Sequence, residues 1–201
     1  MNCYLLEDPM NEDEVAALHQ QLEEAFGDLT IPAEDRLVYD NSGNHLECNQ
    51  IRAKFRGRHW RDLSIEDLMN EPDALAFFTI EAFRFFLPAF IRISLLDPER
   101  ADLIPYHVLS SLAKPADLER WTERKPLLIE AARIRGIPEH VVLELAPTDE
   151  PKLDAICRAR VEALTEAQKC AVQNFISSLR KHRSKEFALG ELDRAAEALR
   201  A

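Results

Sequence analysis

Glycine is scarce in this chain, with 5 among 201 residues. Loops that bind phosphate groups through main-chain amides need several glycines at fixed spacing. Neither G-x-x-x-x-G-K-S/T nor G-x-G-x-x-G occurs in the sequence. A nucleotide-binding loop of either kind is therefore excluded.

The usual metal and disulfide patterns are also missing. The 4 cysteines stand far apart and none forms C-x-x-C, which disfavours a disulfide framework and a cysteine-rich zinc site. Four residues of metal-binding types lie between His45 and His59, but Gly57 separates His59 from the rest, so nothing brings them to one face. We therefore expect no bound metal and no cofactor. No catalytic residue can be named, because catalytic groups assemble in space and not in sequence.

The chain has no long uninterrupted apolar run. The longest stretch, Leu75 to Leu96, is broken by three charged residues and a proline, so it predicts a buried helix and not a membrane span. Residues 1–8 have neither the basic nor the apolar region of a signal peptide. Together with unpaired cysteines, these absences predict a cytoplasmic protein without a membrane partner.

Acidic residues outnumber basic ones, and the excess lies at one end. The net charge is −11, and the first 50 residues hold 12 acidic side chains and 1 basic one. Nucleic acid is an unlikely partner, because phosphate contacts need lysine and arginine. An acidic face would favour a basic protein partner, and the alternative is a solvated face that maintains solubility.

Most of the chain carries helical patterns. Asn11 is typical of a helix N-cap, and Thr79 is expected to cap a central helix. Six of the 10 phenylalanines lie between Phe77 and Phe90, and Pro88 should kink this central helix. We predict an all-α fold: a single compact helical domain around a Pro-kinked, Phe-rich helix, with at most a short β piece.

The expected organisation is a helical domain over residues 1–184 and a C-terminal helical tail over residues 185–201. Residues 115–162 are a candidate insert, in which residues 116–135 look helical but interrupted at Pro126. Short extended pieces are expected at Leu37–Tyr39 and Val141–Leu143. Residues 146–151 are the best candidate for a linker, and whether 115–162 form a subdomain stays open.

Three segments share a pattern with a known family. Residues 47–60 read E-C-x-x-I-x-x-x-F-x-G-x-x-W, residues 82–90 read A-F-R-F-F-L-P-A-F, and residues 165–168 read T-x-x-Q. The chain resembles a family of uncharacterised bacterial proteins over roughly residues 13–112 and 163–180. The resemblance implies a domain of unknown function and brings no activity or catalytic residue with it. A longer stretch at 115–162 and a tail after 184 depart from the family pattern.

A run of five basic side chains surrounds Trp60 between Arg52 and Arg61, and we call residues 52–61 the Arg/Trp segment. Such a run could bind an anion or a protein partner, or it could pair with the acidic first quarter. Trp60 could be a binding anchor or could cover the edge of the core. The candidate binding residues are Glu47, Arg56, Arg58, His59, Trp60 and Arg84.

Arg84 stands in a helix that is apolar on most sides. A buried guanidinium needs a partner, and Glu81 and Glu47 are the two candidates. A Glu47–Arg84 pair would join two helices and need no chemistry. If instead Glu47, Arg56, His59 and Arg84 line an open cleft, they would form a ligand pocket.

The leading hypothesis is a cytoplasmic protein-interaction module that binds a protein partner through its acidic N-terminal face or the Arg/Trp segment. The alternative is a small-ligand-binding protein or an enzyme, with a pocket between residues 47–61 and the central helix. A purely accessory subunit is a third option. The sequence does not identify the partner, the substrate or the oligomeric state.

Overall fold

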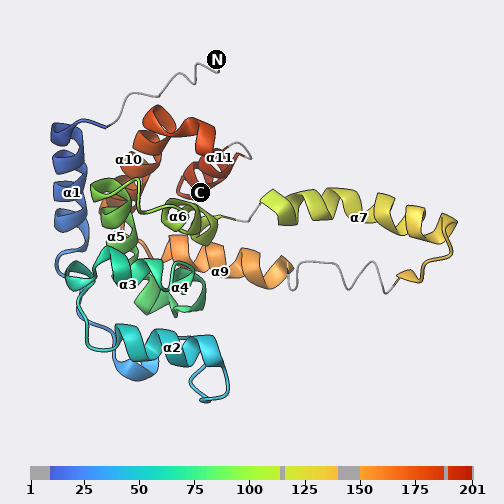
Figure 1. Cartoon of the computed structure of the whole chain (residues 1–201), viewed down its shortest axis with the longest axis horizontal. Helices are drawn as coiled ribbons and strands as arrows, with labels where there is room; N and C mark the ends of the chain where they lie inside the picture. The colour runs from blue at the N-terminus through green and yellow to red at the C-terminus, as the bar shows by residue number, and fades with distance from the viewer. Residues whose placement is uncertain (1–9, 114–115, 140–149, 188–189, 201) are drawn as a thin grey trace.

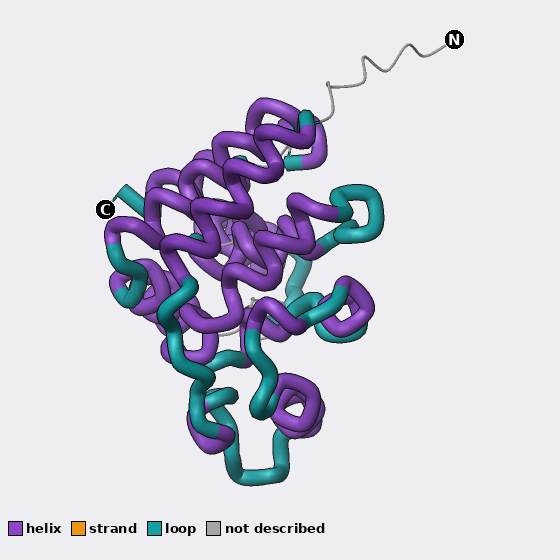
Figure 2. The backbone as a smooth tube through the Cα atoms, turned by 90° about the vertical axis from the view of Figure 1, so that its left-hand side faces the viewer, coloured by secondary structure: helices purple, strands orange, loops and turns teal. Residues whose placement is uncertain are grey.

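The computed structural model describes residues 10–113, 116–139, 150–187 and 190–200 of the chain. Within these ranges helices are the only regular elements, and loops connect them (Figure 2). The prediction of an all-α fold is therefore confirmed. The only β pairing among the described residues is an isolated antiparallel bridge between Val38 and Phe78. It lies where the sequence predicted a short extended piece.

The helices in the described part of the chain are α1 (Glu12–Phe26), α2 (Leu46–Phe55), α3 (Ile65–Met69), α4 (Ala74–Phe77), α5 (Ile80–Leu96), α6 (Ile104–Leu112), α7 (Ala116–Ile134), α9 (Glu150–Glu162), α10 (Glu166–His182) and α11 (Glu191–Ala198). Three short 3-10 turns lie at Glu34–Arg36, Trp60–Asp62 and Ser184–Glu186.

Side-chain caps determine where several helices begin. The Asn11 side chain accepts a hydrogen bond from the Glu14 amide at 2.8 Å, and the Thr79 hydroxyl accepts one from the Ala82 amide at 3.1 Å. Each cap satisfies an amide that has no partner within its helix. The predicted starts of α1 and α5 are therefore confirmed.

Helix α5 lies at the centre of the core. Helices α1, α4, α6 and α9 pack against it, and α1 also packs against α10 (Figure 1). Its phenylalanines are buried, and Phe86 meets the rings of Phe55 and Phe78 at centroid distances of 5.2 and 5.0 Å. The helix continues through Pro88 to Leu96. The Phe-rich helix is thus the core element that the sequence indicated.

Helix α7 projects from the body as an arm (Figure 1). Of its described side chains, Leu127 is 72% exposed and Ile134 is 79% exposed. The prediction that Pro126 interrupts this helix is wrong, because α7 runs from Ala116 to Ile134 through it. On an exposed helix, water can satisfy the carbonyl that a proline leaves without a donor. The predicted strand at Val141–Leu143 lies outside the described residues.

Arg160 joins α9 to the body. Its guanidinium donates from Nη2 to the carbonyl oxygens of Leu75 at 2.6 Å and Ala76 at 3.1 Å, and from Nη1 to that of Ser111 at 3.4 Å. The side chain is only 3% exposed and lies 4.9 Å from the centre of the Phe83 ring. No carboxylate of the described residues pairs with it, and burial lowers its pKa to about 10. Carbonyl oxygens and a ring face therefore take the place of a counter-ion.

None of the helices in the described ranges is long and apolar enough to cross a membrane.

Candidate functional site

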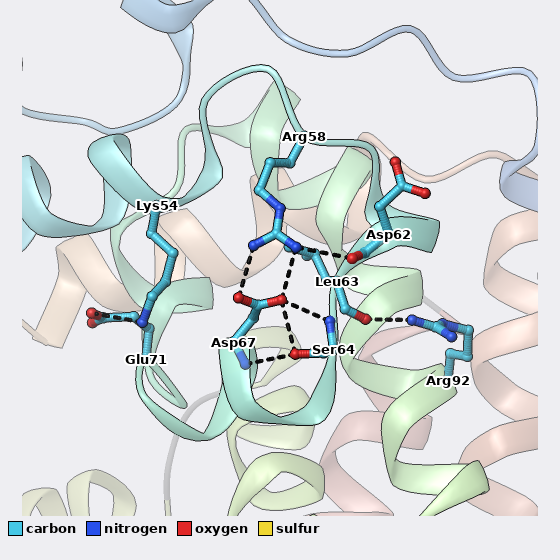
Figure 3. Close-up of polar contacts among 8 residues, drawn as sticks. All are labelled: Lys54, Arg58, Asp62, Leu63, Ser64, Asp67, Glu71 and Arg92. Atoms are coloured by element: carbon cyan, nitrogen blue, oxygen red, sulfur yellow. Dashed lines mark hydrogen bonds and ion pairs between the residues drawn. The ribbon is translucent and has the colours of Figure 1, made fainter.

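The cations of the Arg/Trp segment are mostly occupied by neighbouring residues. Arg58 contacts the Asp67 carboxylate at 2.8 Å and the main-chain oxygen of Asp62 at 2.9 Å (Figure 3). Lys54 lies 3.4 Å from Glu71 in the same view. These contacts join the loop after α2 to α3 and to the turn that follows it. Internal pairing, one of the two interpretations of this segment, is what the structure shows for them.

The remaining arginines of the segment contact the first 50 residues. Arg61 donates from Nε to Glu23 of α1 at 2.6 Å, and Arg56 lies 3.5 Å from Glu34. Arg52 donates to the side chains of two asparagines, Asn41 and Asn49. Among the ion-paired arginines of the Arg/Trp segment, Arg56 is the most exposed, with 61% of its side chain accessible. The segment therefore offers few unpaired charges to a ligand.

Trp60 is fully buried, so it covers the core and is not a surface anchor. Its indole nitrogen has no hydrogen-bond partner among the described residues. The Arg61 guanidinium lies 4.6 Å from the centre of its ring. His59 accepts a hydrogen bond from the Arg61 amide at 3.2 Å, and its ring meets Phe85 at 5.3 Å. Both residues join the segment to α5.

Asp67 is expected to make the stability of the fold depend on pH. Hydrogen bonds from Arg58 and from Ser64 hold its pKa far below the ordinary value of an aspartate. A depressed pKa in the folded state contributes stability above the unfolded pKa and loses it as the pH falls. We expect Asp67→Asn to be about 1 to 2 kcal/mol less stable than the wild type at pH 7. The difference should shrink below about pH 4, measured by urea unfolding across pH.

Asp62→Asn is the matched control for this variant. Arg58 contacts Asp62 through its main-chain oxygen, which the substitution retains (Figure 3). Its stability should stay within about 0.5 kcal/mol of the wild type at every pH. If the difference in the free energy of unfolding between Asp67→Asn and the wild type stays constant down to pH 2, Asp67 is not the source of the acid dependence.

The prediction that Arg84 pairs with Glu81 or Glu47 is wrong. Arg84 donates from Nε to the side-chain oxygen of Gln168 at 2.8 Å, and neither Glu47 nor Glu81 is paired with it. Glu81 lies 3.2 Å from Arg36 instead. Gln168 also accepts from the Thr165 amide at 3.1 Å and completes the predicted capping box of α10. The amide oxygen suffices because Arg84 is only partly buried and keeps contact with solvent.

Glu47 lies far from this contact, on the surface of α2. Its carboxylate is 57% exposed and lies 3.2 Å from Nδ1 of His45. Arg84 lines a cavity of about 440 Å³ together with Thr30, Glu81 and Ala163. Glu47, Arg56 and His59 do not line that cavity, so the structure does not bring the four candidate pocket residues together.

A larger groove in the described part of the chain lies elsewhere. It has a volume of about 870 Å³ and opens where α1 meets the ends of α5 and α10. We call it the α1 groove. Leu96, the last residue of α5, is 51% exposed at this place. The apolar side chains that line the groove are Met10, Val15, Ala16, Leu95, Leu96, Pro98 and Leu179.

Charged groups also line the α1 groove. Glu14 lies beside it, 3.0 Å from Lys181 and 3.1 Å from Nε2 of His182. Hydrogen bonds from Lys181 and from His182 hold the pKa of Glu14 below its ordinary value. Glu12 and Glu99 line the groove and form no ion pair with any residue that the structure describes. Arg183 also lines the groove and is paired with Glu186, so the charges that have no counter-ion among the described residues are the two carboxylates.

Sequence reasoning missed this groove. Leu95 and Leu96 end a helix that is otherwise almost wholly buried, so nothing in their spacing sets Leu96 apart. Glu99 comes from the loop after α5, and residues 179–186 are at least 80 positions further along the chain. The one available signal was local: three acidic residues in the first turn of α1, beside Val15 and Ala16.

No group of three or more histidine, cysteine, aspartate or glutamate side chains that could hold a metal ion occurs among the residues described. Cys157 is buried, and burial raises the pKa of its thiol. A raised pKa keeps a thiol protonated and unreactive.

The described helices and the groove define an all-helical protein with an open surface depression whose lining is mainly apolar and includes both acidic and basic side chains. The chain belongs to a family of unknown function (DUF6714), which it matches over residues 14–125. The match covers the body from α1 into α7, and includes two of the three segments that suggested a resemblance. No curated protein and no solved structure matches the chain.

Proposed function

We propose that this chain is a protein-interaction module whose α1 groove binds a basic, amphipathic segment of a partner protein. The carrying observation is that this groove combines apolar side chains with two carboxylates that have no counter-ion among the described residues. A segment with apolar residues on one face and lysine or arginine beside them satisfies both features.

The apolar part of the groove supplies the binding energy. Burying an exposed leucine such as Leu96 contributes about 1.5 to 3 kcal/mol. Helices α1, α5 and α10 form the walls, and α1 packs against both of the others, so the groove is preformed. A preformed site avoids the free-energy cost of ordering the binding surface.

The charge of the groove selects a basic partner. Several acids of the first quarter are already engaged: Glu23 by Arg61, Glu34 by Arg56, and Glu14 by Lys181. Glu12 and Glu99 remain without an ion pair to any described residue. A partner lysine or arginine placed between them would gain attraction without displacing an internal contact.

The Arg/Trp segment is the weaker docking face. Trp60 is buried, and Arg58 and Arg61 are engaged by Asp67 and Glu23. A partner would have to break these pairs before it gained new ones. The acidic N-terminal face is therefore the better supported of the two surfaces that the sequence suggested.

The test compares two variants that differ in place and not in chemistry. Leu96→Arg puts a cation into the groove, and Leu103→Arg puts one on a leucine of equal exposure outside it, 55% against 51%. The tagged wild type is purified from its own cells at low salt, and bound proteins are identified and titrated in pure form. We expect Leu96→Arg to bind the recovered partner at least tenfold more weakly than the wild type, a loss of about 1.4 kcal/mol. Leu103→Arg should bind it with unchanged affinity.

Salt gives an independent readout. A basic partner attracted by Glu12 and Glu99 should bind more weakly as salt is raised. If both variants bind the partner with the same affinity, or if that affinity does not respond to salt, the α1 groove is not the docking site.

A further inference from the structure

The end of the α7 arm carries an exposed apolar and basic surface. We call residues 131–138 the arm tip. Ile134 is 79% exposed and Ile137 is 41% exposed. The tip contains two arginines and no acid, and Arg135 forms no ion pair with any described residue. Arg133 is paired with Glu130 at 2.8 Å, so Arg135 is the cation that the tip leaves free beside its exposed isoleucines.

The backbone holds the tip in one shape. Gly136 has a positive φ of 68°, which ends the helix. The amides of Gly136 and Ile137 donate back to the carbonyls of Arg133 and Ala132 at 3.2 and 2.9 Å. Because these bonds define the turn, a partner that binds the tip need not order it first.

The arm tip and the α1 groove are complementary. The tip offers isoleucines and arginines, and the groove offers exposed leucine and two carboxylates without counter-ions. They lie at opposite ends of the molecule, with α1 on the left and the end of α7 on the right of Figure 1. The tip cannot reach the groove of its own chain, so the match can be used only between two molecules.

We infer that the arm tip of a second copy of this chain occupies the α1 groove. The inference rests on the proposed function, because it names the partner of the same groove. Two copies that lie side by side in opposite directions would place each tip in the other's groove, which closes the assembly as a two-fold dimer.

The charge distribution favours this arrangement over a contact between two bodies. The chain has a net charge of −11, so two bodies placed face to face repel each other. Residues 114–139 hold six bases and five acids, whereas residues 1–113, which include α1, hold 21 acids and 9 bases. Contact through the tip therefore brings together surfaces of opposite sign.

The experiment measures the mass of the full-length protein by native mass spectrometry and by sedimentation, up to about 100 µM. The variants are Leu96→Arg in the groove and Ile134→Glu at the tip. Leu103→Arg and Ile31→Glu are controls on exposed residues outside both surfaces. We expect dimers for the wild type and both controls, and at least a tenfold weaker association for each of the two test variants.

Mixing the two test variants gives the sharpest result. Leu96→Arg retains its tip and Ile134→Glu retains its groove, so an equimolar mixture can form one intact contact. We expect the mixture to form dimers that contain one copy of each variant, at concentrations where each variant alone stays monomeric. A folding defect would not be repaired by mixing, so the result separates a lost contact from a lost structure.

Three outcomes would overturn the inference: a monomeric wild type, association that persists in both test variants, or a mixture that forms no mixed dimer. None of them decides the proposed function. That proposal fails if a partner recovered from cells binds Leu96→Arg as tightly as the wild type, or if its affinity does not respond to salt. It stands if a different protein occupies the groove in a monomeric chain.

Discussion

Replacing Arg160 by leucine should destabilise the fold by about 3 kcal/mol, measured by urea unfolding. The guanidinium donates to three main-chain oxygens, and two of them belong to the buried residues Leu75 and Ser111. The substitution also removes a buried cation that has no carboxylate partner, which favours the variant. The two buried acceptors that lose their donor outweigh that gain, because each costs about 1 to 3 kcal/mol.

Arg158→Leu is the matched control, two residues away on the same helix. Its guanidinium is 67% exposed and contacts only Asp154, at 3.2 Å. Exposed pairs of this kind contribute about 0.5 kcal/mol. If Arg160→Leu is as stable as Arg158→Leu, then Arg160 does not hold α9 on the body. Arg160→Lys should lie between the two, since an ammonium cannot reproduce the planar fork that reaches three oxygens.

Local signals predicted the helices well. Asn11, Thr79 and Thr165 each begin a helix, because a cap depends only on residues within one turn. The density of phenylalanine around α5 predicted the core for a similar reason: a helix that is apolar on nearly every side must be surrounded. The match to a family of unknown function agrees with the resemblance that those segments suggested.

Long-range contacts were beyond the sequence. Arg84 and Gln168 are 84 positions apart, and a carboxylate is the partner that general chemistry suggests for an arginine. Leu96 and Leu127 look like core residues from their spacing, yet both are exposed. Exposure depends on what packs against a residue, and periodicity states only which face it occupies. The α1 groove and the arm tip both arise from such apolar residues without a cover.

Replacing Gln168 by alanine should destabilise the fold by about 2 to 3 kcal/mol. The side chain is 1% exposed and joins three helices. Its oxygen accepts from Arg84 of α5 and from the Thr165 amide that begins α10, and its nitrogen donates to the Ala25 carbonyl of α1 at 3.1 Å. Gln173→Ala, on the same helix with one long contact of 3.4 Å to the Leu199 oxygen, should cost less than about 1 kcal/mol.

A double-mutant cycle then decides who the partner of Arg84 is. Gln168→Ala combined with Arg84→Met should show a coupling of about 1 to 2 kcal/mol, since the bond involves a charged donor. Glu47→Ala combined with Arg84→Met should show none, because Glu47 contacts His45 and lies on the surface of α2. Coupling in the second cycle and none in the first would restore the pair that the sequence alone suggested. The opposite result places the link between α5 and α10, where an amide and not a carboxylate satisfies a half-buried arginine.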